Sequence, residues 1–240
     1  MGKRIIARRS GRGTPTYSAH SFRWGPAPTH RAYDDKERSG VITGVIMNMH
    51  KYTGYLSPVA EIQYEDKSTT FMFAPLGVKV RDTIQSGALA PPQTGNTLPL
   101  GKIPEGMPVY NIELNAADGG KLVRAPGTSA SNIAYSPEKV TVLLPSKKQK
   151  ELNPACRATI GTIAGAGRRD KPFVTAGARH HLMRSRGKLY PHTSGVAMNA
   201  VDHPFGSGRG RHIGKSKTPS RFAPAGAKVG LIGARRTGRK

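Results

Sequence analysis

The stretch VAEIQYEDKSTTFMF, residues 59–73, decides the fold class of this chain. Apolar and polar residues alternate over residues 59–64, and β-branched and aromatic residues gather at 69–73. The Glu-Asp-Lys sequence at 65–67 is typical of a tight turn between them. The stretch therefore predicts two antiparallel strands joined in a hairpin.

Further short strands are predicted on both sides of this hairpin. They are rich in Val, Ile, Thr and aromatic residues, and they occupy residues 41–47, 78–84, 108–114, 121–124, 139–144 and 158–163. Residues 118–120, Asp-Gly-Gly, form a hairpin-type turn, and residues 37–155 contain no helical period that lasts a dozen residues. The pattern favours a mainly β chain with two consecutive small all-β units. We place the first unit at residues 37–85 and the second, which opens with a linker rich in Gly, Ala and Pro, at 86–160.

Positive charge is concentrated at the two ends of the chain. The 240 residues include 38 Lys and Arg against 14 Asp and Glu, a net charge of +24. Residues 1–36 hold eight basic residues with two acids, and residues 156–240 hold eighteen with two, whereas the middle holds twelve with ten. This distribution predicts a folded body with a basic extension at each end, 1–36 and 161–240, that a polyanionic partner neutralises and orders.

The composition of the extensions points to RNA as that partner. Tyr17 and Trp24 at one end, and Tyr190 and Phe205 at the other, lie among Arg and Lys. Arg binds phosphate while bases stack on rings, so this mixture is typical of RNA-binding segments. Residues 174–186 have Ala, Leu and Met at helical spacing and predict a short helix in the second extension. The residues predicted to contact RNA are Arg8, Arg9, Arg12, Arg23, Trp24, Arg168, Arg169, Lys171, Arg179, His180, His181, Arg184, Arg186, Arg209, Arg211, Arg235 and Arg236.

A membrane or an oxidising compartment fits the sequence less well. The longest apolar stretches have the size of a strand, far short of the ~20 residues of a membrane-spanning helix. We therefore expect no membrane partner, and no signal peptide is recognised at the start. The single cysteine, Cys156, excludes an internal disulfide framework and fits a reducing cytosol.

Three patterns that suggest enzyme or metal chemistry lack the spacing or the scaffold that such chemistry needs. Residues 161–169 are Gly-rich, but they match neither the Walker pattern nor the dinucleotide pattern. Five of the eight histidines lie in the second extension, without the spacing of a zinc site. Asp202-His203 with Ser194 or Ser207 lacks the scaffold of a hydrolase triad. We expect no enzyme activity, no catalytic or metal site, and no cofactor other than structural Mg²⁺ bound together with RNA.

Residues 195–206, GVAMNAVDHPFG, closely resemble the signature of the universal large-ribosomal-subunit protein two family. The likeness covers essentially the whole chain and includes residues 11–13, 17–31, 95–100, 156–161 and 170–173. Ala200 and Phe205 stand where bacterial members usually have Pro and His, which indicates the archaeal and eukaryotic branch. Ser207 and Arg209 replace what is often a run of Gly in the family.

The resemblance implies an oligonucleotide-binding-type barrel followed by an SH3-like barrel, with both extensions threaded into RNA. It implies a structural protein of the large subunit of the cytoplasmic ribosome that binds large-subunit rRNA and contacts neighbouring ribosomal proteins. It also implies support of the peptidyl transferase region, and an indirect part in tRNA binding and association with the small subunit. Peptidyl transfer is attributed to RNA in this family. The motif adds Asn199, Asp202 and His203 as RNA-binding candidates, and we expect His203 to position RNA rather than to act as a general base.

A different interpretation of the same charge pattern is a free-standing nucleic-acid chaperone with β-barrel modules. The two are distinguished by the amount of free protein in a cell extract. An enzyme acting through Asp202 and His203 would be active without RNA, and the sequence shows no scaffold for it.

Overall fold

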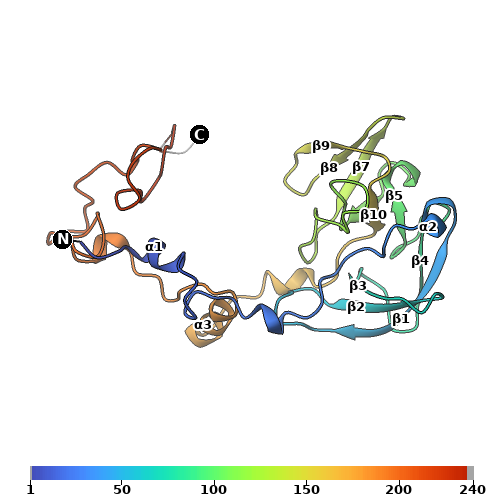
Figure 1. The fold of residues 1–240 in the computed structure, drawn as a ribbon, viewed down its shortest axis with the longest axis horizontal. Coiled ribbons are helices and arrows are strands. Elements are labelled where there is room, and N and C mark those ends of the chain that lie inside the picture. Colours follow the sequence, from blue (N-terminus) through green and yellow to red (C-terminus); the bar gives the residue numbers. More distant parts are fainter. Residues whose placement is uncertain (1, 237–240) are drawn as a thin grey trace. The chain divides into compact units, whose positions relative to one another are not determined.

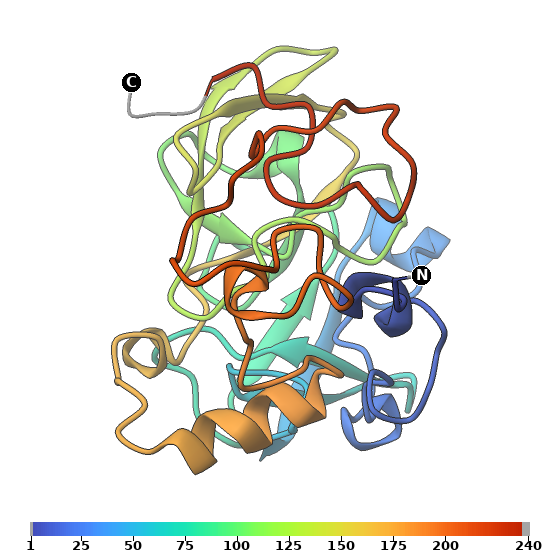
Figure 2. The same cartoon turned by 90° about the vertical axis from the view of Figure 1, so that its left-hand side faces the viewer.

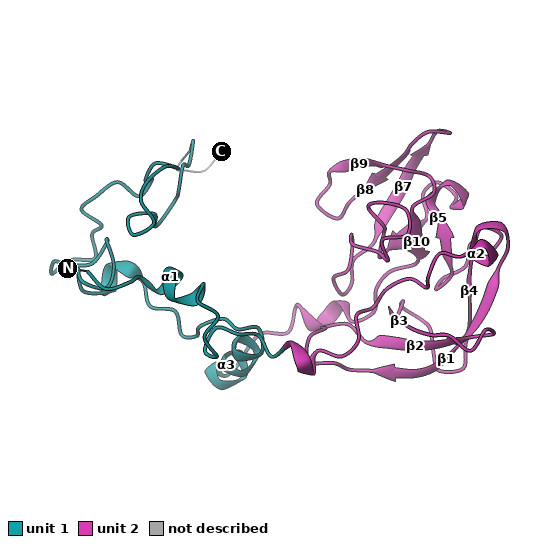
Figure 3. Cartoon of the chain, in the orientation of Figure 1, with its two compact units in different colours: residues 1–20, 173–240 teal, residues 21–172 magenta. Residues whose placement is uncertain are grey.

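The structure is a computed structural model that describes residues 2–236. Residue 1 and residues 237–240, the outermost ends of the two predicted extensions, lie outside the described residues. The chain divides into two compact units (Figure 3). Residues 21–172 form the unit that we call the β unit, and residues 1–20 together with 173–240 form the one that we call the terminal unit. Segments from the two ends of the chain thus pack on each other.

The β unit is built on ten hydrogen-bonded strands (Figure 1). Their order is β3-β2-β1-β4-β5-β10-β6-β7-β8-β9, and the pairings are antiparallel except for a short parallel contact of β4 with β5. This network confirms the predicted mainly β fold class. The strands are β1 (Ile42–His50), β2 (Val59–Tyr64), β3 (Thr69–Phe73), β4 (Thr83–Ser86), β5 (Thr97–Pro99), β6 (Pro108–Tyr110), β7 (Ala130–Tyr135), β8 (Val140–Leu143), β9 (Gln149–Leu152) and β10 (Arg157–Ile160).

The hairpin predicted from residues 59–73 is confirmed. β2 and β3 pair from Val59 opposite Phe73 to Gln63 opposite Thr69. The turn is closed by the Ser68 N–H, which donates to the Asp66 carboxylate at 3.0 Å. Because successive side chains of a strand point to opposite faces, the alternating sequence of β2 buries one face and leaves Gln63 exposed.

Two clusters of buried apolar side chains stabilise the β unit. One lies mainly among β1 to β4 and includes Ile46, and the other lies within residues 90–160 and includes Leu100. Tyr110 of β6 belongs to the first cluster, where its hydroxyl donates to the Phe73 carbonyl at 2.8 Å. The second half of the unit therefore completes the core of the first half. The predicted domain boundaries at 36/37, 85/86 and 160/161 stay predictions.

One predicted strand lies at a different place. The strand expected at 78–84 begins only at Thr83, because a turn precedes it. Arg81 adopts a positive φ of 75° there, and the Asp82 carboxylate accepts the Lys79 N–H at 2.9 Å. Aspartate competes in this way for nearby backbone N–H groups and favours turns over strands.

Other strands differ because of their pairing partners. The segment expected as a strand at 121–124 makes only an isolated bridge, of Leu122 with Ile112, and is interrupted by a φ of 53° at Val123. β7 and β9 were not predicted, since their residues are mostly small or polar. They become strands because they pair with the two edges of the apolar strand β8.

The terminal unit consists mainly of loops with two short α-helices. These are α1 (Ile6–Ser10) and α3 (Ala176–Ser185), the orange helix of Figure 2, and α3 confirms the helix predicted at 174–186. Among the described residues of this unit, Ile5 and Val229 are the buried apolar side chains. A core of this size contributes little to stability, so the unit depends on its backbone contacts and on whatever binds it. Within residues 2–236 no helix has the length and apolar character needed to cross a membrane.

Candidate nucleic-acid interface

Almost all residues predicted to contact RNA have exposed side chains. In the terminal unit the exposed set comprises Arg8, Arg9, Arg12, Arg179, His180, His181, Arg184, Arg186, Asn199, Arg209, Arg211, Arg235 and Arg236. In the β unit it comprises Arg23, Arg168, Arg169 and Lys171. Trp24, Asp202 and His203 are half-buried. Exposed guanidinium groups keep their charge available to phosphate oxygens.

The terminal unit carries most of the net charge. Its residues 1–20 and 173–240 contain nineteen Lys and Arg and one acid, Asp202. That carboxylate lies 3.7 Å from the Lys3 ammonium, so it is already paired within the unit. A surface of one sign and this density attracts a polyanion and releases its counterions on binding.

Helix α3 displays basic and aromatic groups together. The guanidinium of Arg179 lies 5.3 Å from the centre of the Tyr190 ring, and the rings of His180 and His181 meet edge to face at 5.5 Å. Among the residues described, no group of three His, Cys, Asp or Glu side chains lies close enough together to hold a metal ion. The helix therefore offers stacking faces and positive charge.

The motif at 195–206 folds into a tight turn around His203. The N–H groups of Asp202 and His203 both donate to the Asn199 carbonyl, at 3.0 and 3.1 Å. The Phe205 N–H donates to Nδ1 of His203 at 3.1 Å, so the neutral ring carries its proton on Nε2. His203 thus presents a hydrogen-bond donor beyond the turn.

Two glycines make this turn possible. A Cβ atom on Gly195 would overlap the His203 ring, and a Cβ on Gly206 would overlap the carbonyl oxygens of Met198 and Asn199. Ser207, which stands where the family often has Gly, adopts a φ of 97°, a conformation that favours glycine. The segment is tied to the start of the chain by the Lys3 N–H, which donates to the Val201 carbonyl at 2.9 Å.

Trp24 packs on the β unit and has one covered face. A Cβ on Gly54 would lie 2.5 Å from Cβ and Cγ of Trp24, so the indole rests directly on the Gly54 backbone. Phe22, two residues earlier, is 79% exposed, and the guanidinium of Arg23 lies 5.3 Å from its ring centre. Phe22 is therefore better placed than Trp24 to stack on a base.

Arg157 has a role that charge counting alone does not predict. It belongs to the basic residues of 156–240, but its side chain is 2% exposed and pairs with two fully buried carboxylates. Its Nη1 donates to Glu37 at 2.6 Å and to the Arg31 carbonyl at 2.7 Å, and its Nη2 donates to Glu113 at 2.8 Å. The Tyr33 ring centre lies 4.6 Å from the guanidinium. Arg157 therefore stabilises the fold, and its buried guanidinium is not available to an RNA phosphate.

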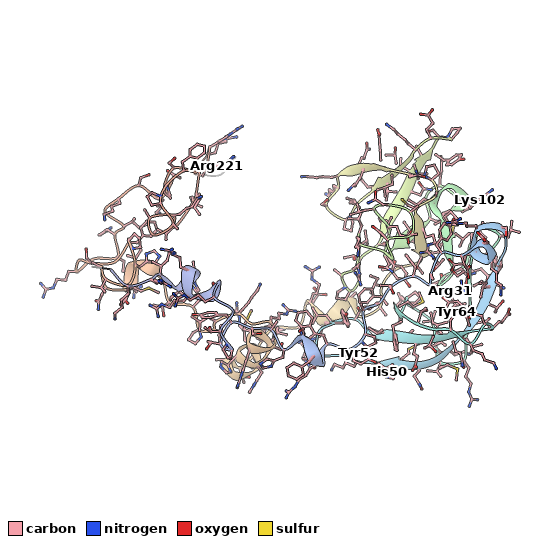
Figure 4. The ribbon with its side chains drawn as sticks, viewed as in Figure 1. Arg31, His50, Tyr52, Tyr64, Lys102 and Arg221 are labelled. Carbon is pink, nitrogen blue, oxygen red and sulfur yellow. The ribbon has the colours of Figure 1, made fainter. Side chains whose placement is uncertain are left out.

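Contacts of this kind fasten residues 28–37 to the strands and loops that follow them in the β unit. His30 Nε2 donates to the Asn111 carbonyl at 2.6 Å, and the Arg124 guanidinium donates to the Pro28 carbonyl at 2.8 Å. Arg31 is 8% exposed, pairs with two aspartates, and lies beside Tyr64 with 5.9 Å to the ring centre (Figure 4). The last part of the predicted N-terminal extension is thus anchored to the strands.

The pKa values in this cluster follow burial and the number of donors. Burial, and next the charge of Arg157, lower the pKa of His30 from 6.5 to about 4. Burial raises the pKa of Glu37, although Ser86 and Arg157 donate to it. Burial also opposes ionisation of Glu113, but side-chain and backbone donation from Arg157 outweighs it and lowers the pKa. The donors around Glu113 thus stabilise its ionised form more than burial destabilises it.

The comparisons with known proteins agree with the resemblance seen in the sequence. Residues 93–223 match the family model described as the C-terminal domain of ribosomal proteins L2. The chain is 47% identical over 240 residues to the large ribosomal subunit protein uL2 of Methanothermobacter thermautotrophicus, and the match covers all of both chains. It is 49% identical over 239 residues to the protein of the same name from Halorubrum lacusprofundi, covering 100% of this chain and 98% of the relative. A third such relative, from Methanococcus maripaludis, is 47% identical over 240 residues.

Proposed function

The chain belongs to the uL2 family of large-ribosomal-subunit proteins, and from this premise we propose that its terminal unit binds large-subunit rRNA directly. The family is structural, so the chain is a structural protein of the large ribosomal subunit and not an enzyme. Its similarity to archaeal relatives agrees with the branch indicated by Ala200 and Phe205. We propose the cytoplasmic ribosome as its location.

The charge of the terminal unit is the observation that carries this proposal. The unit has nineteen basic residues, one acid that is already paired, and almost no apolar core. This composition suits a segment that folds in contact with phosphates. The logarithm of the affinity should then fall linearly with the logarithm of the salt concentration. The slope should be near −0.9 for each duplex phosphate neutralised and about −0.7 for each single-strand phosphate. Structural Mg²⁺ would be bound together with the RNA, and the chain has no cofactor of its own in this proposal.

The β unit anchors the end of the predicted N-terminal extension. The Arg157 contacts to Arg31, Tyr33 and Glu37 hold residues 28–37 in a fixed position at the end of the predicted N-terminal extension. Arg23, Arg168, Arg169 and Lys171 lie exposed near the two ends of the unit in sequence, where the chain continues into the terminal unit. A fixed position for residues 28–37 lowers the entropy that is lost when the preceding segment binds RNA.

We assign His203 a positioning role near the peptidyl transferase region. Nδ1 of His203 accepts a hydrogen bond from the Phe205 N–H, and Nε2 of the neutral ring carries the proton. The ring therefore has a donor but no free nitrogen that could accept a proton from a substrate. A group in this state positions an RNA acceptor and is a poor general base. Support of tRNA binding, of association with the small subunit and of contacts with neighbouring ribosomal proteins belongs to the same proposal.

Sedimentation of a native extract tests the proposed function. Each gradient fraction is probed for this chain at low salt and after a high-salt wash. The proposal expects co-migration with the large subunit that survives the wash, since the basic segments would be enclosed by RNA. A free-standing nucleic-acid chaperone would instead give a peak of free protein or be lost on mild washing.

The His203→Ala variant tests the positioning role separately. Large subunits that contain it should still form peptide bonds on a fast substrate, with at most a change in the structure of nearby RNA. Particles with unchanged RNA structure that fail to form peptide bonds would contradict the role proposed for His203.

A further inference from the structure

Two clefts adjoin in the terminal unit. The first has a volume of about 440 Å³, and its walls include the apolar and aromatic side chains of Tyr17, Leu189 and Met198. The second has a volume of about 300 Å³, and its walls include Lys3, Arg4 and Arg8. Ile5 and His203 line both clefts, so the two share a wall.

We propose that these clefts together bind one unstacked nucleotide of the RNA, with its base in the first cleft and its phosphate in the second. The inference rests on the proposed function and makes it more specific, because it assigns a nucleotide-sized site to a unit otherwise argued from charge alone.

The first cleft has the size and chemistry of a site for a base. Its volume lies in the range of small-molecule pockets, about 300–1,000 Å³. Tyr17 supplies an aromatic face for stacking, while Ser10, His192 and Thr193 supply polar groups for the edge of a base. Ile5 is 6% exposed and forms an apolar wall.

The second cleft is suited to a phosphate. Lys3, Arg4 and Arg8 are all exposed, and the Arg9 guanidinium fixes the local backbone by donating to the Arg4 carbonyl at 2.8 Å. The one acid of the unit, Asp202, is held by Lys3 and does not line either cleft. An anion of high charge density therefore complements this wall better than a neutral ligand does.

His203 joins the two halves of the site. Its ring forms part of the shared wall, and the proton on Nε2 leaves a donor for a phosphate oxygen or for an acceptor on the base. The His203 ring packs directly against the Gly195 backbone and cannot move toward it. The turn thus fixes the donor at the junction of the two clefts.

The test compares two oligonucleotides that differ by one base. The probe is an eight-unit chain of abasic spacers with a single 2-aminopurine, and its control is the same chain with no base. Both have the same phosphates, so non-specific charge attraction cancels at one fixed salt concentration. The full-length protein should bind the base-bearing probe about tenfold more tightly, which is the effect of one stacked base, and should quench its fluorescence.

A matched pair of variants locates the effect. Thr193 is exposed and lines the first cleft, while its neighbour Ser194 is exposed and does not line it. Thr193→Trp should fill the cleft and abolish the preference for the base-bearing probe, while Ser194→Trp should keep it. Equal binding of both probes by the wild-type chain would overturn the proposal, and so would equal effects of the two variants.

The nucleotide site and the proposed function can be refuted by different outcomes. A wild-type chain that co-sediments with the large subunit but does not distinguish the two probes refutes the nucleotide site alone. A chain that does not co-sediment refutes the ribosomal proposal, whatever the probes show.

Discussion

His30 makes the stability of the β unit depend on pH. Its imidazole donates to the Asn111 carbonyl, and burial and the charge of Arg157 lower its pKa from 6.5 to about 4. Between these values the unfolded chain binds a proton that the folded chain does not. The stability that His30 contributes is therefore complete above pH 6.5 and is lost as the pH falls toward 4.

The size of this loss follows from the two pKa values. A gap between 6.5 and about 4 corresponds to about 3 kcal/mol, at ~1.4 kcal/mol per pH unit. At pH 4.5, just above the folded value, about 2–3 kcal/mol of it is already gone. That is a large part of the ~5–15 kcal/mol by which domains are usually stable.

The assay is urea unfolding between pH 7 and pH 4.5, followed by tryptophan fluorescence. Trp24 is the one tryptophan of the chain and lies in the β unit, so its signal reports on this unit. The control is His30→Gln, which keeps a donor for Asn111 but does not titrate. The wild type should lose about 2–3 kcal/mol more than the variant over this range. Equal losses in the two proteins would refute the assignment of this pH dependence to His30.

Three further outcomes are expected. Arg157→Leu leaves two fully buried carboxylates unpaired and should lower the free energy of unfolding by about 3–5 kcal/mol in the same urea assay, so an unchanged midpoint would contradict its role. Gly206→Ala should displace the turn at Asn199 and reduce incorporation into large subunits in a competition with wild type, whereas Gly177→Ala, where a Cβ meets open space, should not. Without RNA, residues 173–236 should be cleaved by protease before the β unit, because they have almost no core; equal protection would argue against this.

The sequence pattern predicts those strands in which apolar and polar residues alternate or β-branched and aromatic residues gather. The alternation at 59–64 and the aromatic run at 69–73 give β2 and β3 with the observed bounds. β7 and β9 have no such pattern, and they form because β8 offers them backbone partners. Such strand pairing depends on tertiary structure and cannot be recognised from the sequence of one segment alone.

The surface charge of the candidate site could be predicted, but not the inward-facing cations. Arg157 and Arg31 belong to basic segments, yet both are buried. Arg157 pairs with Glu37 and Glu113, and Arg31 pairs with Asp66 as well as with the nearby Asp34. The available sequence signal for Arg157 is its place directly before the strand predicted at 158–163. In the structure it begins β10, where every side chain is buried. The motif at 195–206 was recognised in the sequence, whereas its turn around His203 and the adjoining clefts appear only in the folded unit, because the clefts require both chain ends.

The salt dependence of binding to a large-subunit rRNA transcript tests whether the terminal unit carries the RNA interface. Two triple variants remove the same charge, one by neutralising Arg179, Arg184 and Arg186 in and just after α3, the other by neutralising the exposed Lys147, Lys148 and Lys150 of the β unit. We expect the arginine variant to reduce the slope of log affinity against log salt concentration by about 2, and the lysine variant to leave it nearly unchanged. Equal reductions, or a larger one for the lysine variant, would contradict the claim that the terminal unit carries the RNA interface.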